Sequence, residues 1–439
     1  MSRTALLAAS TAAALTLAAC GGPAALPPSA GFGPNPTLPE PHRGMFPTVK
    51  VADAVGWPAG ATPTAAPGLR VQAFASGLDH PRWIYRLPNG DVLVAESAAP
   101  PKPEGLKKDE GIKGFFQTLF MKKAGSVTPS ANRITLLRDA DGDGIAEMKS
   151  VFLSGLTSPF GMALAGGRLY VANADSVVSV PYQDGQTEAS EPPVKLTDLP
   201  AQRNHHWTKS LVASADGSKL YVGVGSNSNV ADHGMAEETN RAAILEIDRM
   251  TGVSRVYAGG LRNPVGMAWN PESRMLWVAV NERDEIGDDL VPDYMTSVTP
   301  GAFYGWPWSY YGQTVDERVK PQNPAMVASA IRPDYALGAH TASLGLTFYD
   351  GTAMPRYRNG AFIGQHGSWN RSEPSGYKVI FVPFAGGKPS GPPQDVLTGF
   401  LNAQSQAQGR PVGVQTDRTG ALLVADDVGN VIWRVTPAA

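Results

Sequence analysis

The strongest constraint on the fold is a sequence pattern that recurs six times after residue 68. Each copy has a short loop, most often of the form Pro-x-Gly-apolar, followed by a polar turn and an apolar strand. Turns such as Asn89-Gly90 and Asp216-Gly217 separate the strands, and helical periodicity is scarce. The copies pair residues 81–84 with 91–94, 159–162 with 168–171, 207–211 with 219–222, 264–267 with 275–278, 343–346 with 361–364, and 411–414 with 421–424.

Repeats of this kind bury their faces only against their neighbours, so they predict an all-β, six-bladed β-propeller over residues 68–439. A two-sheet β-sandwich is the alternative. In a propeller, the loop that leads into each innermost strand lies at one end of the central channel. We therefore expect the polar residues of these loops to meet there: Arg82, His205, His206, Arg262, Asn263, His340 and Arg410.

An amphipathic helical insertion interrupts the first repeat at residues 98–133. Its apolar residues recur at helical spacing and lysines flank them. Such a helix fits a lipid surface, or it covers a blade. The apolar positions are Ile112, Phe115, Phe116, Leu119 and Phe120.

The amino terminus reads as a lipoprotein signal peptide over residues 1–20. Arg3 precedes an Ala/Leu-rich segment that ends at Cys20, the only cysteine among the 439 residues. We expect lipidation of Cys20, and Gly21 after it is typical of an outer-membrane protein facing the periplasm. Residues 21–67 are predicted to be a flexible tether and lead-in. The net charge of −2 gives no reason to expect a nucleic-acid partner.

Two acidic segments are candidate metal sites. In the first, Asp139, Asp141, Asp143 and Glu147 stand at positions 1, 3, 5 and 9 of a loop with Gly at position 6. This spacing is typical of calcium loops, although position 12 is Ser150 rather than Glu. A solvated acidic turn is the alternative.

The second acidic segment lies in the stretch 260–312, between a basic/amide pair and an aromatic run. Donors, oxygen ligands and flat apolar walls together suit an anionic, planar ligand beside a divalent cation. An exposed acidic loop beside aromatic packing is the alternative. The candidate metal ligands here are Asn281, Glu282, Asp288 and Asp289.

His206 is the candidate catalytic residue. A histidine whose pKa is near neutral can take a proton from an alcohol. His205 and His340 compete for the same role.

Several longer motifs, in one order over residues 68–437, carry a family resemblance. The chain resembles the pyrroloquinoline-quinone (PQQ)-dependent sugar dehydrogenases, specifically the L-sorbosone dehydrogenase branch. The motifs are His205-His206-Trp207-Thr208-Lys209, Gly223 to Asn229, Gly260 to Gly266, Asn281 to Glu285, Phe303 to Pro307, and Gln365 to Arg371.

The resemblance implies an enzyme that oxidises a sugar or sugar aldehyde by hydride transfer to PQQ, with calcium beside the quinone. His206 resembles the base, Arg262 and Asn263 resemble cofactor contacts, and Arg410 resembles a partner of the quinone carboxylates. We also count His340, Asn227 and Arg371 as candidate cofactor-binding residues. A sugar, an unidentified electron acceptor and the membrane, through Cys20, are the expected partners.

The chain departs from the soluble glucose branch of that family. His205 stands where that branch has Asp, and Asn281-Glu282-Arg283 where it has Gln-Gly-Pro. The cofactor lysine has no clear match, which leaves His366, Ser368 or Arg371 for its place. A calcium-dependent lactonase-type hydrolase and a non-catalytic binding propeller of the cell envelope remain the alternative functions.

Overall fold

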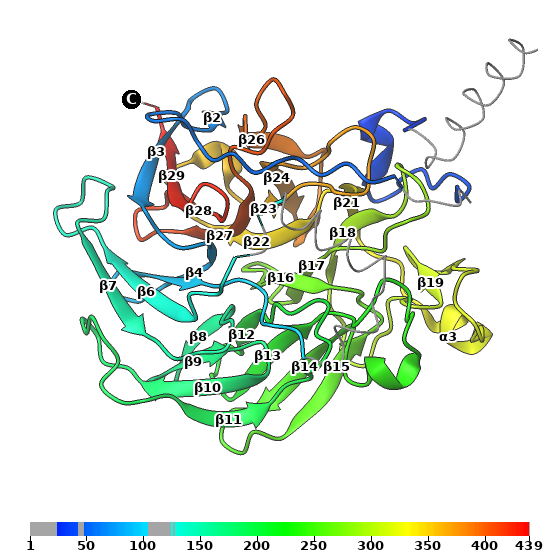
Figure 1. Ribbon diagram of the computed structural model, residues 1–439, viewed down its shortest axis with the longest axis horizontal. Helices are drawn as coiled ribbons and strands as arrows, with labels where there is room; N and C mark the ends of the chain where they lie inside the picture. Colours follow the sequence, from blue (N-terminus) through cyan, green and yellow to red (C-terminus); the bar gives the residue numbers. More distant parts are fainter. Residues whose placement is uncertain (1–23, 43–47, 104–123, 126–127, 439) are drawn as a thin grey trace, which may run out of the picture.

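The computed structural model shows a six-bladed β-propeller (Figure 1), which confirms the predicted fold. The structure describes residues 24–42, 48–103, 124–125 and 128–438. Blade 1 contains β4 (Pro81–Arg86), β5 (Val92–Glu96), β6 (Arg133–Arg138) and β7 (Met148–Leu153). Blade 2 contains β8 (Met162–Ala165), β9 (Arg168–Ala172), β10 (Ser176–Pro181) and β11 (Val194–Asp198). Blade 3 contains β12 (Leu211–Ala213), β13 (Lys219–Val224), β14 (Ala243–Asp248) and β15 (Ser254–Gly259).

The remaining blades take in strands from distant parts of the chain. Blade 4 contains β16 (Pro264–Trp269), β17 (Leu276–Val280), β18 (Pro292–Ser297) and β21 (Tyr335–Ala339), with β1 (Phe32–Gly33) at its edge. Blade 5 contains β22 (Ser343–Tyr349), β23 (Gly360–Gln365), β24 (Lys378–Ala385) and β26 (Gln394–Thr398), with β2 (Thr64–Ala65) at its edge and β25 (Lys388–Pro389) on β24. Blade 6 contains β27 (Pro411–Thr416), β28 (Leu422–Asp426), β29 (Val431–Pro437) and β3 (Leu69–Ser76).

Blade 6 closes the ring, because β3 from the amino-terminal side pairs with the last strand, β29. Outside the blades, the described elements are short. They are the hairpin β19 (Ser309–Tyr310) and β20 (Thr314–Val315), the helix α3 (Pro324–Ser329), and the 3-10 turns η1 (Pro28–Gly31), η2 (Met235–Glu238) and η3 (Pro355–Tyr357).

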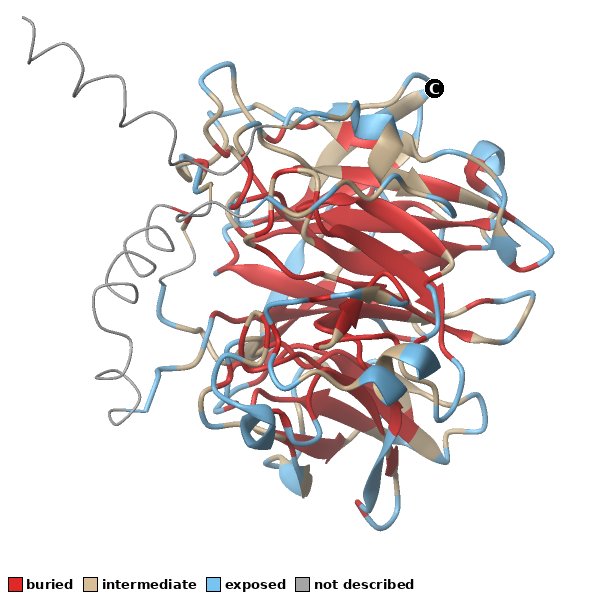
Figure 2. Cartoon of the chain, turned by 90° about the vertical axis from the view of Figure 1, so that its right-hand side faces the viewer, coloured by how far each residue is buried: buried red, intermediate tan, exposed pale blue. Residues whose placement is uncertain are grey.

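The glycine of the Pro-x-Gly pattern lets neighbouring blades approach closely. A Cβ on Gly266 in β16 would lie 2.5 Å from the carbonyl oxygen of Leu344 in β22. A Cβ on Gly161 would lie 2.2 Å from the backbone nitrogen of Leu211. Any side chain at these positions would push the inner strands apart, so the repeated glycine follows from the packing of the channel. The buried strand interiors appear red in Figure 2, and most exposed residues lie in the peripheral loops.

Strand direction alternates within each blade. The loop before an inner strand and the loop between the second and third strands of a blade therefore lie at the same end of the channel. We call this end the channel mouth. Its described residues are the loops before β4, β8, β12, β16, β22 and β27 together with residues 97–103, 124–125, 128–132, 173–175, 225–242, 281–291, 366–377 and 427–430.

The described part of the predicted tether is bound to the propeller, which differs from the expectation of a flexible segment. Ala54 bridges to Ala407, and the Lys50 amide donates to the carbonyl of Trp369 at 2.9 Å. The Trp57 indole packs edge-on against Phe400 and Trp433. The composition of the segment did not predict this attachment, because the segment has too few apolar residues to form a core. Its apolar side chains instead pack against the cores of the blades. The predicted signal peptide and most of the helical insertion lie outside the described residues.

Replacement of Trp57 by Ala tests this attachment. The indole Nε1 donates to the buried Asp426 carboxylate at 2.7 Å, so the change removes both packing and a donor. We expect the free energy of unfolding to fall by about 3 kcal/mol, the usual scale for truncating a packed tryptophan. Chemical denaturation measures it. Val55→Ala, at an exposed neighbour, is the control and should change stability by less than about 0.5 kcal/mol. Equal small losses in both variants would show that the segment is not bound.

Candidate active site

His206 lies in the loop before β12 with one ring nitrogen fixed. Its Nδ1 is 2.9 Å from the carbonyl oxygen of Ser226 and 3.1 Å from the Ser226 hydroxyl. A carbonyl only accepts, and the Ser226 hydroxyl donates to the Ser228 carbonyl at 2.7 Å. Nδ1 must therefore carry the ring proton, and Nε2 carries the lone pair.

The imidazole of His206 is kept neutral. Burial lowers its pKa well below the ordinary value, and the positive charge of Arg262 acts in the same direction. Asn263 lies beside it, because a Cβ on Gly225 would meet both the His206 Cβ at 2.4 Å and Asn263 Oδ1 at 2.3 Å. His206 is thus a neutral, oriented base, which is the state that proton abstraction requires.

His340 is chemically different from His206. Its Nε2 is 2.9 Å from the carbonyl of Gly287 and its Nδ1 is 3.1 Å from Asp284 Oδ1, so both ring nitrogens face acceptors. Burial opposes protonation, but the hydrogen bond to Asp284 prevails and raises the pKa of His340. Of the two histidines, only His206 has the free lone pair of a base.

Arg262 is committed to protein acceptors. Its guanidinium donates to the carbonyl of Glu282 at 2.5 Å and to Asn229 Oδ1 at 3.0 Å, and it pairs with Asp284 at 3.2 Å. The carbonyl of Asn281 is a further acceptor at 3.3 Å. The acceptor oxygens of Asn281, Glu282 and Asp284 lie in the segment where the second metal site was expected. In the structure they bind the Arg262 guanidinium.

The candidate ligands of that second metal site do not come together. Glu282 accepts from the Arg283 amide at 2.9 Å, Asp288 from the Ser372 amide at 2.8 Å, and Asp289 from the Ala25 amide at 2.7 Å. The Asn281 amide donates to Asp293 at 3.1 Å. Among the described residues, Glu282, Asp288 and Asp289 do not belong to any group of three or more potential ligands that lie close together. These residues do not fit a calcium ion at the channel mouth, so we derive no step through one there.

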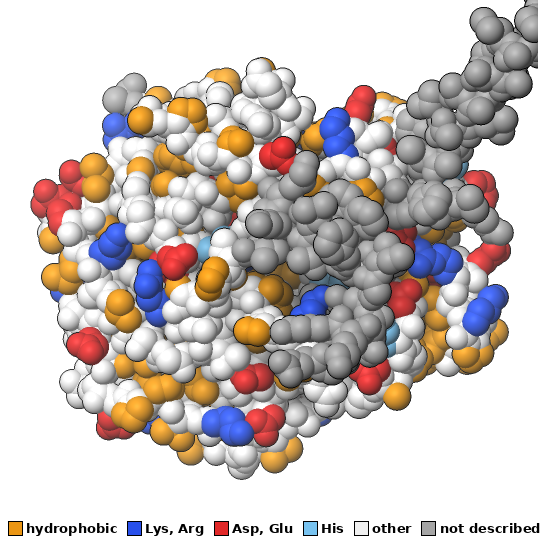
Figure 3. Space-filling model, viewed as in Figure 1, with side chains coloured by type: hydrophobic (Ala, Val, Ile, Leu, Met, Phe, Trp, Pro, Cys, Tyr) orange, Lys and Arg blue, Asp and Glu red, His pale blue; other side chains and the backbone are white. Residues whose placement is uncertain are grey.

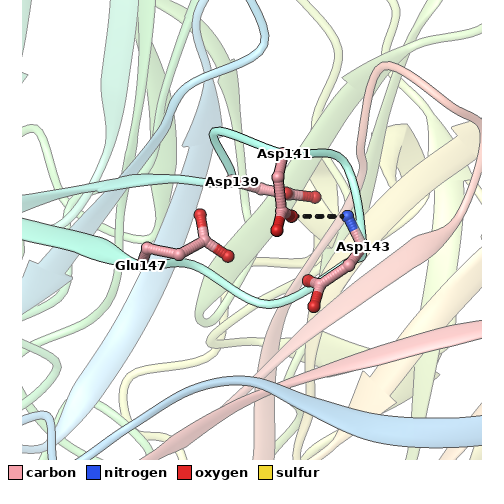
Figure 4. Close-up of side chains that lie close together, drawn as sticks. All are labelled: Asp139, Asp141, Asp143 and Glu147. Carbon is pink, nitrogen blue, oxygen red and sulfur yellow. Dashed lines mark hydrogen bonds between the residues drawn. The ribbon is translucent and has the colours of Figure 1, made fainter.

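Asp139, Asp141, Asp143 and Glu147 do come together. One oxygen from each lies within 4.8 Å of the others, and this is the one such group of three or more potential ligands in the described part of the chain (Figure 4). The loop connects β6 to β7 and therefore lies at the end opposite the channel mouth. Gln72 of β3 donates to the carbonyl of Gly144 at 3.0 Å, which joins the loop to blade 6.

Arg410 is a buried guanidinium that forms no ion pair with a carboxylate in the described part of the chain. It is 4% exposed and lies over the Tyr377 ring at 5.0 Å. Its Nη2 donates to the carbonyl of Ala52 at 3.3 Å, while its Nε has no partner. A buried cation in this state fits an anionic ligand.

Other unpartnered polar atoms gather at the same end of the strands. They come from five of the six blades, which indicates a polar site rather than a closed apolar core. They are Arg82 Nε, Ser97 Oγ, Ser210 Oγ, Asn263 Oδ1, Gln365 Oε1 and Arg410 Nε. Figure 3 shows histidine and basic side chains on one face of the molecule.

Two further predicted residues are held by the protein itself. The Asn227 amide group donates to the carbonyl of Glu237 at 3.1 Å, and its backbone donates to Glu238 at 2.7 Å. Arg371 pairs with Asp289 at 3.4 Å and also donates to the carbonyl of Asp288. Both therefore shape loops at the channel mouth.

Two residues at the site, Asp427 and Ser226, were not predicted as site residues from the sequence. Asp427 binds Arg82 and lies 2.9 Å from His366 Nε2. Ser226 fixes the His206 ring. The repeat could have pointed to Asp427, because it directly follows β28 at the channel mouth.

Family models and curated relatives match large parts of the chain. A family model described as a domain of unknown function (DUF7133) matches residues 67–368, and a TrAA12-like model matches residues 312–438. An uncharacterized protein of Borreliella burgdorferi is 30% identical over 296 residues, which cover 64% of this chain and 76% of that protein. A PQQ-dependent pyranose dehydrogenase of Coprinopsis cinerea is 24% identical over 360 residues, 72% of this chain and 44% of the enzyme.

Solved structures share the fold. The PQQ domain of the Coprinopsis cinerea pyranose dehydrogenase, in its holo form, has a TM-score of 0.69 at 21% identity and covers 88% of this chain and 100% of that domain. The soluble aldose sugar dehydrogenase of Escherichia coli has a TM-score of 0.57 at 17% identity, with coverage of 84% and 100%. The match of the DUF7133 model over most of the propeller shows that the chain belongs to this family.

Proposed function

We propose that this protein is a quinoprotein sugar dehydrogenase that binds PQQ at the channel mouth and uses His206 as its general base. The observation that carries the proposal is the neutral, oriented His206 imidazole in a mouth that contains buried, unpartnered polar atoms. Relatives named as PQQ-dependent pyranose dehydrogenase and aldose sugar dehydrogenase support it. A sugar or sugar aldehyde of the aldose or sorbosone type is the proposed substrate.

The residues at the mouth fit PQQ, which carries three carboxylates on a planar ring system. Arg410 supplies a buried charge that lacks a carboxylate, and Asn263 Oδ1 and Arg82 Nε are free to accept and donate. Trp207, at 5.6 Å from the Arg82 guanidinium, adds a flat wall next to His206. Bound PQQ would supply a two-electron acceptor for the hydride of the sugar carbon.

The chain's own contribution is proton transfer and orientation. Nε2 of His206 accepts the hydroxyl proton of the sugar, and the ring then holds a proton on each nitrogen. The Ser226 carbonyl, which already accepts from Nδ1, stabilises this imidazolium and keeps the ring from turning. Arg262 opposes the charge, so the proton is readily passed on to water.

Titration of the purified apoprotein with PQQ tests the proposal. Quenching of tryptophan fluorescence reports binding, and dye reduction with a panel of aldoses reports turnover. Binding with turnover is the expected result. Lactone hydrolysis with metal alone would indicate a hydrolase, and neither binding nor turnover would indicate a binding propeller.

We also propose that calcium binds the loop that contains Asp139, Asp141, Asp143 and Glu147. Calcium at 100 times its dissociation constant should stabilise the chelator-treated protein by about 2.7 kcal/mol. Thermal unfolding with and without calcium measures this. Asp141→Ala, which removes the ligand oxygen, should abolish the gain, whereas Asp184→Ala, in a separate exposed turn, should keep it. The same gain in both variants would place the ion elsewhere.

We propose that the protein is anchored at the bacterial outer membrane through lipidated Cys20, facing the periplasm. Within the described residues, no helix has both the length and the apolar character needed to cross a membrane. Cys20→Ala should move the protein from the membrane fraction to the soluble fraction, because acyl chains supply about 0.8 kcal/mol per buried CH₂. Blotting of both fractions after a high-salt wash measures the change. Retention of the variant in the membrane would contradict the anchor.

A further inference from the structure

The loop that carries His206 rests on two buried basic side chains. Lys209 is 0% exposed and Arg241 is 6% exposed. Among the described residues, no carboxylate forms an ion pair with either of them. Glu238 attracts Arg241 and Asp175 attracts Lys209 from beyond ion-pair distance, so hydrogen bonds must offset most of the cost of burying these two basic groups.

Lys209 donates only to the segment on which His206 lies. Its Nζ is 2.9 Å from Asn204 Oδ1, 3.0 Å from the carbonyl of Trp207 and 3.4 Å from the carbonyl of His206. All three of these acceptors belong to residues 204–207. Burial, with Arg241 beside it, lowers the pKa of Lys209 well below its ordinary value.

Arg241 holds the two sides of the same loop together. It donates to the carbonyls of Ala201 at 2.7 Å and Pro200 at 3.0 Å, and to Asn204 Oδ1 at 3.2 Å. Its other nitrogen donates to the carbonyl of Gly225 at 3.1 Å. Gly225 lies in the loop after β13 and packs directly against the Cβ of His206. The hydrogen bond from Arg241 to Gly225 therefore helps to fix the position of the His206 ring.

We propose that Lys209 and Arg241 are positioning residues that hold residues 200–207 in the conformation in which His206 Nε2 faces the channel mouth. The inference rests on the proposed function, because the position of this loop affects turnover only if His206 is the base. It goes beyond that function by assigning a role to two side chains that cannot reach a substrate from their buried positions.

The choice of acceptors fits this role. Each acceptor is a neutral carbonyl or amide oxygen, so the loop is fixed without a carboxylate beside the imidazole. A carboxylate there would favour the protonated ring, which cannot accept a proton. The positive charge of Arg241 instead contributes to lowering the pKa of His206.

Hydrogen exchange of the apoprotein tests the positioning claim without the cofactor. In Lys209→Met, which keeps the length of the side chain, we expect faster exchange in a peptide covering residues 200–207. The His206 ring should also lose its single Nδ1–H tautomer in long-range ¹H–¹⁵N spectra. Lys219→Met, at a half-buried lysine paired with Asp248, is the control and should change neither.

Asn204→Gly is the second variant if Lys209→Met does not fold. Asn204 has φ of 47°, which glycine adopts without strain, and the change removes the oxygen that Lys209 and Arg241 share. The same increase in exchange at residues 200–207 is expected. Unchanged exchange and an unchanged tautomer in the folded variant would overturn the proposal.

Kinetics with bound quinone separate this inference from the proposed function. We expect kcat of the Lys209 variant to fall about 10²-fold, the scale for misplacing a catalytic group by about 1 Å, with PQQ affinity unchanged. A parallel loss of PQQ affinity and kcat would overturn the positioning role. If the wild-type protein binds no PQQ, the proposed function fails, while the exchange data still decide whether Lys209 holds the loop.

Discussion

His206→Ala should lower kcat by about 10²–10⁴-fold while the protein still folds and binds PQQ. The reason is that Nε2 carries the lone pair that takes the sugar proton, whereas the cofactor is held by other residues. Only Nδ1 has a structural partner, the Ser226 group, so removal of the ring breaks few contacts. Steady-state rates and PQQ titration on the same variant measure the two effects separately.

His205→Ala is the control for this prediction. His205 is adjacent in sequence, but its side chain is exposed, and its described hydrogen bond is from the backbone amide to Asn227 Oδ1. We expect its kcat to stay within about threefold of the wild-type value, because the described contact of the His205 ring with His206 is edge-on ring packing at 4.7 Å, whereas Ser226 holds the His206 ring by hydrogen bonds. A large loss in His205→Ala with normal rates in His206→Ala would move the base by one residue. Normal rates in both would remove the loop from the mechanism.

The fold could be predicted because the repeated glycine is needed where the inner strands of neighbouring blades pack closely. Each Pro-x-Gly loop begins an inner strand, and a glycine such as Gly266 is required where that strand meets the next blade. The strand pairs follow as β-hairpins whose two members are close in sequence, so local patterns suffice. The attachment of residues 48–57 depends on distant partners such as Asp426, and no local pattern encodes it.

The candidate site could be predicted in position but only partly in chemistry. Loop placement brought His206, Asn263 and Arg410 to the channel mouth, because topology alone decides which strand ends meet. Topology does not decide which donor takes which acceptor. Arg262 forms an ion pair with Asp284, whereas Arg410 forms none with the described carboxylates and its Nε has no partner. Although the two arginines have similar neighbours in the sequence, only Arg410 can readily bind an anionic ligand.

Asp427→Asn should destabilise the protein by about 3–5 kcal/mol, the usual cost of breaking a buried ion pair from one side. The carboxylate side chain is 1% exposed, binds Arg82, and lies 2.9 Å from His366 Nε2 and 3.6 Å from His80 Nε2. Asparagine leaves the Arg82 guanidinium buried without its carboxylate. Because Arg82 lies over Trp207, next to His206, we also expect weaker PQQ binding.

Chemical denaturation as a function of pH distinguishes the charge of Asp427 from its shape. Burial acts to raise the pKa of this carboxyl group, but His366, His80 and Arg82 together lower it below its ordinary value. A carboxylate with a lowered folded-state pKa contributes stability above its unfolded-state pKa of about 3.9, and this contribution disappears as the pH falls. The difference in free energy of unfolding between the wild-type protein and Asp427→Asn should therefore be full at pH 6 and shrink below about pH 4.

Asp198→Asn is the control, because its pair with Lys195 is exposed and should contribute no more than about 1 kcal/mol. A destabilisation of Asp427→Asn that stays constant down to pH 2 would mean that the amide group disturbs packing and that the ion pair contributes nothing.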